Sequence, residues 1–273
     1  MVKTTKSSKN TPAKSKITLE NLHKWNIWMA VLHFVQGVAV LILSTSATLP
    51  VITNYLSLDT LASEASGQPV LALAQKTVFN INLAYLVVAF FFMSAIAHAL
   101  IATVYRARYE ANLKQGINKA RWIEYSLSAS TMMVAIALLS GVYDLSSLIM
   151  IFALDAVMNL MGLAMEVTNQ GKKKPNWLTY WIGCLAGIIP WVVFGIYVWG
   201  ASAYGAGNIP TFVYWIYASI FVFFNSFAIN MYLQYKKTGK WSDYLYGEKV
   251  YMILSLVAKS VLAWQVFAGT LRP

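Results

Sequence analysis

Charged residues are scarce in this sequence. They make up 11% of its 273 residues, whereas about a quarter of the residues of an ordinary soluble domain are charged. Hydrophobic residues make up 58% of the chain. This balance is wrong for a soluble domain, and it indicates a bundle of membrane spans instead.

Cysteine is almost absent. The single cysteine, Cys184, lies in an apolar stretch, so no internal disulfide can form and the redox compartment stays undetermined. The sequence also lacks a CxxC pair, a Cys/His metal spacing and a nucleophile–base constellation. We therefore expect no metal site and no enzymatic activity.

Acidic residues are few, with 10 Asp and Glu against 21 Lys and Arg. No nucleic-acid-binding motif accompanies the net charge of +11, so we expect no nucleic-acid partner. In membrane proteins, basic residues collect in cytoplasmic loops. Residues 1–24 contain no apolar core and are therefore not a secretory signal. We expect them to form a solvated, polar cytoplasmic tail.

Long apolar runs are abundant. Seven stretches meet the requirement of roughly 20 mostly apolar residues for a spanning helix. They cover residues 25–46, 78–104, 120–141, 143–168, 178–200, 210–235 and 247–270. These runs are too long and too uniformly apolar for barrel strands. The sequence therefore predicts an all-α membrane protein, with a seven-transmembrane-helix bundle in residues 25–273.

The basic residues fall mainly on one side of this arrangement. Of the 21 Lys and Arg residues, 18 lie in the tail and in the second, fourth and sixth connections, whereas Lys76 and Arg272 lie on the other side. The positive-inside rule then predicts a cell-membrane protein with a cytoplasmic N-terminus and an extracellular C-terminus. The extracellular first loop, at about 47–77, contains possible strands such as "LPVITNYL". A packed cap and a flexible loop both remain open.

Lys259 interrupts the last apolar run, "SLVAKSVLAW". It lies about 12 residues into that span, or roughly 18 Å at 1.5 Å per residue, near the bilayer midplane. An unpaired ammonium there costs at least ~2.5–3.5 kcal/mol. The lysine therefore either pairs with a buried acid or uses its amine in covalent chemistry, because a desolvated lysine is a good Schiff-base nucleophile.

Glu124 is the candidate partner of Lys259. The third span opens with "ARWIEYSLSAS", in which Arg121 and Glu124 are three residues apart and share a helix face. Helical side chains lean toward the helix N-terminus, which brings the amine of Lys259 toward the level of Glu124. Pairing with Lys259 and an ordinary interfacial ion pair with Arg121 both remain open for Glu124.

Several segments together resemble the heliorhodopsin family. They are "LSLVAKSVLAWQVF", "RWIEYSLSAS", "FVFFNSFAINMYLQYKKTGKWSDYL" and "GCLAGIIPWVVF". The similar segments are spread over most of the chain. The family implies a rhodopsin-like fold, inverted in the membrane relative to ordinary microbial rhodopsins, which agrees with the cytoplasmic N-terminus predicted above.

The resemblance implies that Lys259 binds all-trans retinal covalently as a protonated Schiff base and that Glu124 is its counterion. A nearby carboxylate keeps such a group charged in a low dielectric. Ser255, one helical turn before Lys259, is expected to hydrogen-bond around the Schiff base. A serine that bonds its own helix backbone explains this position equally well.

His33 and His98 match the family's two membrane histidines. With Glu124, Arg121 and Gln36, they are expected to line a hydrated cavity that takes a proton after illumination. A purely structural, hydrogen-bonded role for the two histidines also remains open.

Asp155 departs from the family pattern, in which we expect an uncharged polar residue. It lies near the midplane of the fourth span, and an acid inside the membrane is by default a functional hypothesis. We expect a neutral carboxyl that is bonded, for instance, to Asn159. Two hypotheses follow: Asp155 affects the colour of retinal, or it is a second proton site.

Aromatic, amide and small residues are expected to shape the ligand site, although most aromatics in a membrane bundle only pack. The candidates are Met158, Gly162, Pro190, Trp191, Phe223, Phe224, Asn225 and Trp264.

The resemblance favours a light sensor that pumps no ions, in which retinal isomerisation alters the charge pair and the cytoplasmic surface seen by an unidentified signalling partner. It also implies a homodimer in the lipid bilayer. A light-driven or light-gated ion transporter is the first alternative, but outer halves such as "MMVAIALL" offer a poor polar path. A light-independent membrane scaffold or receptor is the second.

Overall fold

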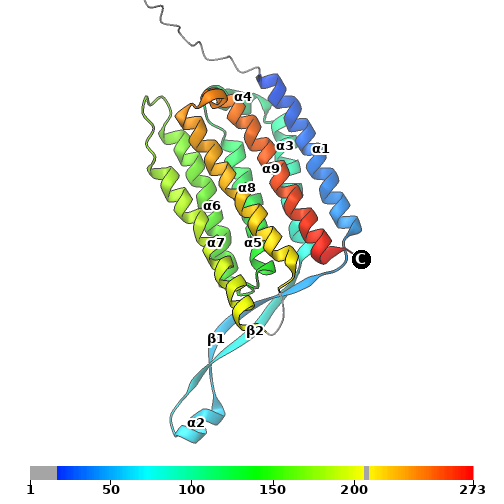
Figure 1. The fold of residues 1–273 in the computed structure, drawn as a ribbon, viewed down its shortest axis with the longest axis vertical. Helices are drawn as coiled ribbons and strands as arrows, with labels where there is room; N and C mark the ends of the chain where they lie inside the picture. The colour runs from blue at the N-terminus through cyan, green and yellow to red at the C-terminus, as the bar shows by residue number, and fades with distance from the viewer. Residues whose placement is uncertain (1–16, 206–208, 273) are drawn as a thin grey trace, which may run out of the picture.

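The computed structural model describes residues 17–205 and 209–272, and its main feature is a bundle of seven long apolar helices (Figure 1). These helices confirm the predicted seven-span, all-α membrane fold. They are α1 Leu19–Leu43, α3 Leu83–Ala102, α5 Lys119–Leu139, α6 Leu145–Thr168, α7 Leu178–Tyr204, α8 Thr211–Lys236 and α9 Tyr244–Val266, which continues as the π-helical turn Phe267–Leu271.

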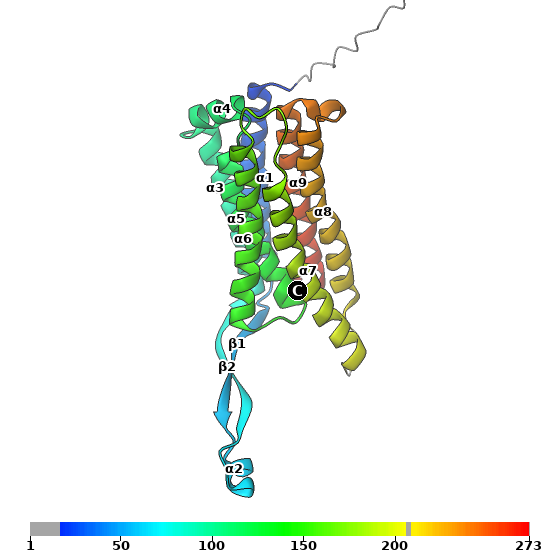
Figure 2. The same cartoon turned by 90° about the vertical axis from the view of Figure 1, so that its left-hand side faces the viewer.

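The two ends of the bundle carry different connections. The short helix α4 Arg106–Lys114 joins α3 to α5 at one end, here called the α4 end. At the opposite end, the hairpin end, strands β1 Thr48–Leu58 and β2 Leu71–Asn82 join α1 to α3, with α2 Thr60–Ser66 at the tip (Figures 1 and 2). The C-terminus lies at the hairpin end.

Helix α1 begins six residues earlier than the predicted start at residue 25. Thr18 caps it: the Thr18 side chain accepts the N–H of Asn21, and the Asn21 side chain accepts the N–H of Thr18, both at 3.1 Å. This reciprocal pair satisfies donors that a helix start leaves free. Residues 19–24 therefore belong to the first helix and not to the tail, while residues 1–16 of the predicted tail lie outside the described residues.

The first connection is neither a packed cap nor an irregular loop. β1 and β2 pair in antiparallel register from Thr48↔Asn82 to Leu58↔Leu71. The base of the hairpin contacts the bundle through buried Val51 and through the N–H of Ile52, which donates to Tyr143 O at 2.9 Å. Most of its length projects away from the helices (Figure 2). Residues 78–82 are therefore strand, and the second span starts at Leu83, not at residue 78.

Helix α4 was not expected, because its sequence is polar. Arg106 forms ion pairs with Glu110 at 2.7 Å and with Glu20 on α1 at 2.9 Å. Tyr109 and Leu113 are buried and pack in a small apolar cluster with Leu22 and Met29 of α1 and Met252 of α9, among others. The connection therefore closes the α4 end of the bundle.

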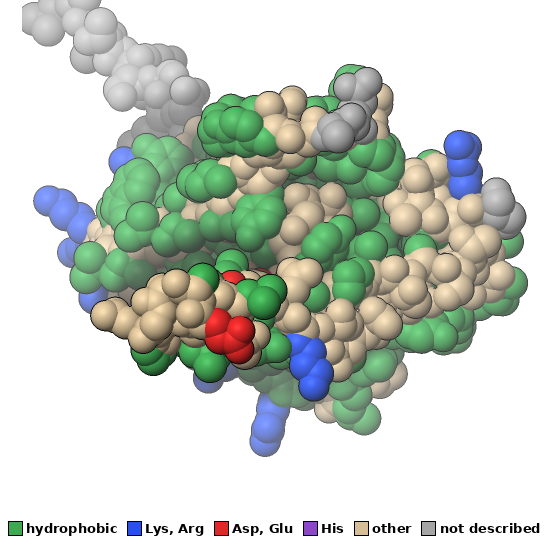
Figure 3. Space-filling view, turned by 90° about the horizontal axis from the view of Figure 1, so that it is seen from below, with side chains coloured by type: hydrophobic (Ala, Val, Ile, Leu, Met, Phe, Trp, Pro, Cys, Tyr) green, Lys and Arg blue, Asp and Glu red, His purple; other side chains and the backbone are tan. Residues whose placement is uncertain are grey.

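The interior is polar in one half and apolar in the other. Along the described chain, the buried polar side chains of the seven long helices lie in the middle of the bundle or toward the α4 end: Asn26, His33, Ser94, His98, Arg121, Glu124, Ser126, Ser128, Ser130, Thr131, Asp155, Asn159, Glu166, Asn230, Gln234, Glu248, Ser255 and Lys259. The hairpin half is filled by a cluster that includes Val40, Phe90, Leu138, Phe194 and Val266. Few charged side chains are visible on the molecule from that end (Figure 3).

Asp144 joins the hairpin to the bundle and caps α6. Its Oδ2 accepts from Ser146 Oγ and from the N–H of Ser147, and these bonds lower the pKa of the carboxyl. Asn54 on β1 donates to its Oδ1 at 3.3 Å.

Replacing Asp144 with Ala should lower the free energy of unfolding of the bundle by about 1 kcal/mol at neutral pH, because the N-cap bond is lost. A carboxyl with a lowered folded-state pKa stabilises above its ordinary pKa of about 3.9, and this contribution disappears as the pH falls through the folded-state value. Thermal unfolding in detergent, followed by helical circular dichroism, measures the difference. Asp59→Ala, which removes the N-cap of α2 at the hairpin tip, is the matched control and should leave the bundle unchanged; equal losses in the two variants would contradict the assignment.

Candidate functional site: a buried lysine at the wall of an apolar cavity

Lys259 is buried in the middle of the bundle, with a side chain that is 2% exposed. Its Nζ lies 3.1 Å from Glu124 Oε1 on α5 and 2.8 Å from Ser255 Oγ, one turn earlier on α9. The face of the Tyr125 ring lies 5.2 Å from the same nitrogen. The structure therefore brings together the lysine, the acid and the serine that the sequence singled out.

Glu124 is held by hydroxyls as well as by the lysine. Ser94 Oγ on α3 and Ser128 Oγ, one turn along α5, each donate to Glu124 Oε1 at 2.6 Å. Three donors converge on one carboxylate oxygen, an arrangement that favours the ionised acid. The alternative of an ion pair between Glu124 and Arg121 is wrong, because the carboxylate contacts Lys259 instead.

Arg121 pairs with two acids from distant segments. Its Nη2 lies 2.6 Å from Glu166 Oε1 on α6, and its Nη1 contacts Glu248 on α9. The guanidinium packs against the faces of two rings, those of Trp122 and Tyr251, at 4.4 Å and 3.9 Å from their centroids. This buried cluster ties α5, α6 and α9 together near the α4 end.

A small polar cavity separates this cluster from the lysine pair. Its volume is about 20 Å³, which suffices for a water molecule. It is lined by Asn26, Ala97, His98, Ile101, Tyr109, Asn118, Arg121, Glu124, Tyr125, Glu248 and Met252. The expected cavity therefore contains His98, Arg121 and Glu124, but neither of the other two predicted members, His33 and Gln36. Gln36 Oε1 instead accepts from Trp264 Nε1 at 3.2 Å.

The two histidines pack against one another. Their rings are stacked with centroids 5.8 Å apart, and His98 Nδ1 lies 2.7 Å from Asn26 Oδ1. His33 is fully buried, and neither of its ring nitrogens has a hydrogen-bond partner within the described residues. A role for either histidine in taking up a proton stays a prediction.

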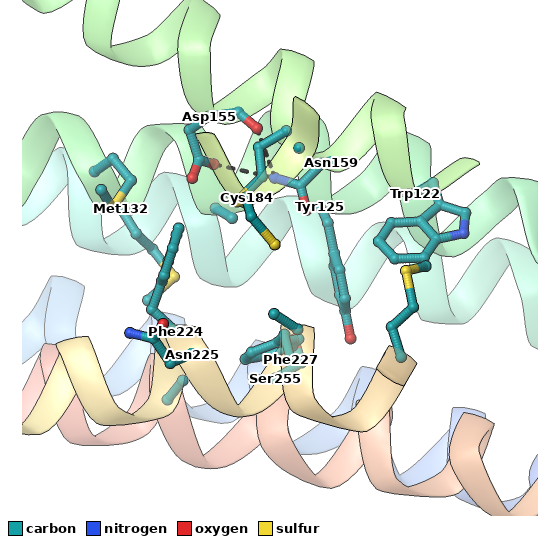
Figure 4. A pocket seen from close by; sticks show the side chains of 18 of the residues that line it. Trp122, Tyr125, Met132, Asp155, Asn159, Cys184, Phe224, Asn225, Phe227 and Ser255 are labelled. Carbon is teal, nitrogen blue, oxygen red and sulfur yellow. Dashed lines mark hydrogen bonds between the residues drawn. The ribbon is translucent and has the colours of Figure 1, made fainter. Parts of the chain in front are cut away.

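A larger cavity of about 160 Å³, with Lys259 among its lining residues, lies between α5 and α6 on one side and α8 and α9 on the other, with α7 contributing (Figure 4). Its lining on α5 extends from Trp122 to Ile136, a rise of about 21 Å along that helix. The wall is mostly aromatic, aliphatic and methionine side chains. The cavity is therefore long and mostly apolar, and Lys259 supplies the one amine among its lining residues.

The predicted ligand contacts divide into two groups. Ser255, Asp155, Met158, Gly162, Phe224 and Asn225 line the larger cavity. Pro190, Trp191, Phe223 and Trp264 do not line it. Trp191 stands behind the wall, where its ring lies edge-on to Phe224 at 5.6 Å, and Trp264 is 38% exposed. For these four, periodicity alone did not reveal which helix face each occupies.

Sequence reasoning missed much of the site. The remaining lining residues include Trp122, Tyr125, Met132, Met133, Ile136, Tyr180, Gly183, Cys184, Ile220, Phe227, Met231 and Ala258. The spacing of four between Glu124 and Ser128 was a usable signal. The sequence also contained a usable signal for Glu166 and Glu248, because an acid inside a span demands a partner. No local signal identified Ser94, since its contact depends on how α3 packs against α5.

The walls fit a slender ligand attached to the lysine. A Cβ added to Gly187 on α7 would lie 2.5 Å from Met158 Sδ and 2.9 Å from Phe224 Cζ. A Cβ added to Gly162 on α6 would lie 2.4 Å from the Trp122 ring. Glycine thus lets these large side chains close around the cavity. Apolar walls, one terminal amine and an acid beside that amine match the donor set that covalently bound retinal requires.

Comparison with a solved structure identifies the fold. The chain has the fold of the light-driven proton pump LR (Mac) from Leptosphaeria maculans, with a TM-score of 0.61 and 15% sequence identity over 90% of this chain and 92% of that chain. At this identity the similarity establishes the fold alone, which is that of a microbial rhodopsin.

A family assignment follows from the sequence itself. The heliorhodopsin family profile matches residues 22–271. The chain therefore belongs to the heliorhodopsin family, whose members are light-responsive retinal proteins, and it is a multi-pass membrane protein. Among curated proteins, no sequence matches this chain.

Replacing Arg121 with Gln should destabilise the folded protein by about 3–5 kcal/mol, because Glu166 and Glu248 would remain buried without a cation. Thermal unfolding in detergent measures the loss. Adding Glu166→Gln and Glu248→Gln to Arg121→Gln should recover most of it, since no buried charge then remains unpaired. Arg106→Gln, in the half-exposed cluster on α4, is the matched control and should change little. Failure of the triple variant to recover stability would contradict the charge argument.

Proposed function

We propose that this protein is a light sensor that binds all-trans retinal covalently on Lys259 and does not pump ions. The observation that carries the proposal is the position of Lys259: its amine lies 3.1 Å from Glu124, and the residue is part of the wall of the apolar cavity. A static ion pair would need the acid but not the cavity. The cavity and the acid together fit an attachment site for a chromophore.

Retinal bound to Lys259 as a protonated Schiff base would supply a light-absorbing cation whose shape changes on illumination. The protein's own residues prepare for that charge. Glu124 provides the negative partner, and Ser94 and Ser128 hold its Oε1 in place. Ser255 Oγ accepts from Nζ at 2.8 Å and orients it. Bulk water is kept from the pair by the surrounding buried helices.

The one-sided interior supports a sensor over a pump. Transport needs polar groups on both sides of the retinal attachment. From Lys259 toward the α4 end, the described interior contains Glu124, His98 and the Arg121 cluster. Toward the hairpin end, α5 continues with buried Met132, Met133, Ile136 and Leu138. The buried polar groups therefore end near the level of Lys259 and Asp155, and the interior beyond them toward the hairpin end is an apolar barrier.

We also propose that the α4 end faces the cytoplasm. The connections at that end contain Arg108, Lys114, Lys172, Lys236 and Lys240. Only Lys76 and Arg272 are basic at the hairpin end of the described chain. Basic residues are retained on the cytoplasmic side of membrane proteins. Displacement of charge at Lys259 would then be communicated through the polar half to this surface, where a signalling partner would bind. The homodimer, the partner and the absence of enzymatic activity stay predictions.

Adding all-trans retinal to the purified apoprotein should produce a visible absorption band, and Lys259→Ala should abolish it. Lys249→Ala, on the same helix and near the α4 end, is the matched control and should retain it. Absorption spectroscopy with matched protein concentrations gives the result. Absence of a band in the unaltered protein would leave a light-independent scaffold or receptor as the better account. A light-induced pH change in cells that an uncoupler removes would contradict the non-pumping part.

The orientation is tested with single cysteines in a Cys184→Ala background. In intact cells, a membrane-impermeant maleimide should label Ser57→Cys on β1 and leave Thr238→Cys, between α8 and α9, unlabelled until the cells are opened. The two positions lie at opposite ends of the bundle, so each serves as the control for the other. Labelling of Thr238→Cys alone in intact cells would reverse the proposed orientation.

A further inference from the structure

Asp155 is unlike the other three aspartates of the chain. Asp59, Asp144 and Asp243 are N-caps of α2, α6 and α9, and the side chain of each accepts a backbone N–H. Asp155 lies inside α6, is 0% exposed and forms part of the wall of the larger cavity. Capping does not explain an acid in this position.

Within the described residues, no cation forms an ion pair with Asp155. Its Oδ2 lies 3.1 Å from Ser130 Oγ on α5 and 3.1 Å from Asn159 Nδ2 on α6, while Oδ1 has no partner within the described chain. The other ionisable groups that line the cavity are Tyr125 on α5, Tyr180 and Cys184 on α7, and Lys259 on α9. None of them is hydrogen-bonded or ion-paired to Asp155 among the described contacts. An ionised carboxylate is strongly disfavoured in such surroundings.

The hydrogen bonds around Asp155 accommodate a proton on its carboxyl. The hydroxyl of Ser130 has a single proton to donate, and its nearer acceptor is Ser126 O at 2.8 Å. When that proton is donated to Ser126 O, the contact between Ser130 Oγ and Asp155 Oδ2 is completed by a proton on the acid. Asn159 Nδ2 has two protons, and they satisfy the backbone O of Asp155 at 2.9 Å and its Oδ2. Every contact of Oδ2 is therefore completed when the carboxyl is neutral.

We propose that Asp155 is a neutral carboxylic acid that donates from Oδ2 to Ser130 and presents Oδ1 to the ligand cavity, as a second proton-bearing group of the site. Figure 4 shows the carboxyl at the cavity wall, bonded to Asn159 and beside the space near Met132 and Phe224. Ser130 is on α5, the helix that also carries Glu124. Asp155 is thus a positioning residue: it touches the contents of the cavity through Oδ1 and is bonded to α5 through Ser130, so a change in the shape of those contents would reach α5.

The protonation of Asp155 requires no ligand, whereas its response to light rests on the proposed retinal function. The two parts are therefore tested separately. The first test uses protein labelled with ¹³C in aspartate, kept in the dark at pH 7, and observes the side-chain carboxyl resonances by NMR.

One of the four aspartate side-chain carboxyl signals should be protonated at pH 7, whereas the signal of Asp144, whose pKa is lowered, should be ionised. Asp155→Asn should remove the protonated signal. Asp144→Asn, at the start of the same helix, is the matched control and should remove an ionised one. Four ionised signals at pH 7, or a protonated signal that persists in Asp155→Asn, would overturn the neutral acid.

The second test records light-minus-dark infrared spectra of the retinal-loaded protein. A carboxylic-acid C=O change should appear, should be lost in Asp155→Asn and should persist in Asp144→Asn. Ser130→Ala should shift its frequency, because the acid loses its acceptor. If the visible band forms but light leaves this acid unchanged, the positioning role is overturned. If no visible band forms, the proposed retinal function fails, and the dark NMR result still decides the protonation of Asp155.

Discussion

One buried charge pair constrains the rest of this molecule. An ammonium in the membrane interior is strongly unfavourable without a compensating acid, and Glu124 supplies that acid 3.1 Å from Lys259. The same carboxylate oxygen accepts from Ser94 on α3 and from Ser128 on α5. Three helices must therefore keep their relative positions for the pair to persist. The Arg121 cluster, which joins α5, α6 and α9, secures two of these helices a second time.

The distribution of polarity follows from that constraint. The buried polar groups, which include the partners of Lys259, are gathered between the middle of the bundle and the α4 end. The hairpin half needs no such groups, and it is packed with aliphatic and aromatic side chains. Asp155 stands at the boundary between these halves. As a neutral acid it adds a proton-bearing group to the cavity without introducing a charge that would need its own partner.

Local sequence patterns predicted what depends on local composition. Apolar runs predicted the seven helices, and a lone lysine in the last run led to Glu124. Contacts between distant segments were not predictable in this way. Residues 78–82 were assigned to a helix because short apolar strands and helices look alike in sequence. Spacing left a pair between Arg121 and Glu124 open, whereas the partners of Arg121, Glu166 and Glu248, come from other helices. Trp191 faces other aromatics, and only packing reveals that.

The central claim is that Glu124 keeps a chromophore on Lys259 charged, and a pH titration of the visible absorption tests it most directly. In the unaltered protein, the visible band should persist through neutral pH, because the carboxylate stabilises the positive charge. In Glu124→Gln, which keeps the shape but removes the charge, the band should move to much shorter wavelength at neutral pH and return on acidification. An identical titration in the two proteins would contradict the account.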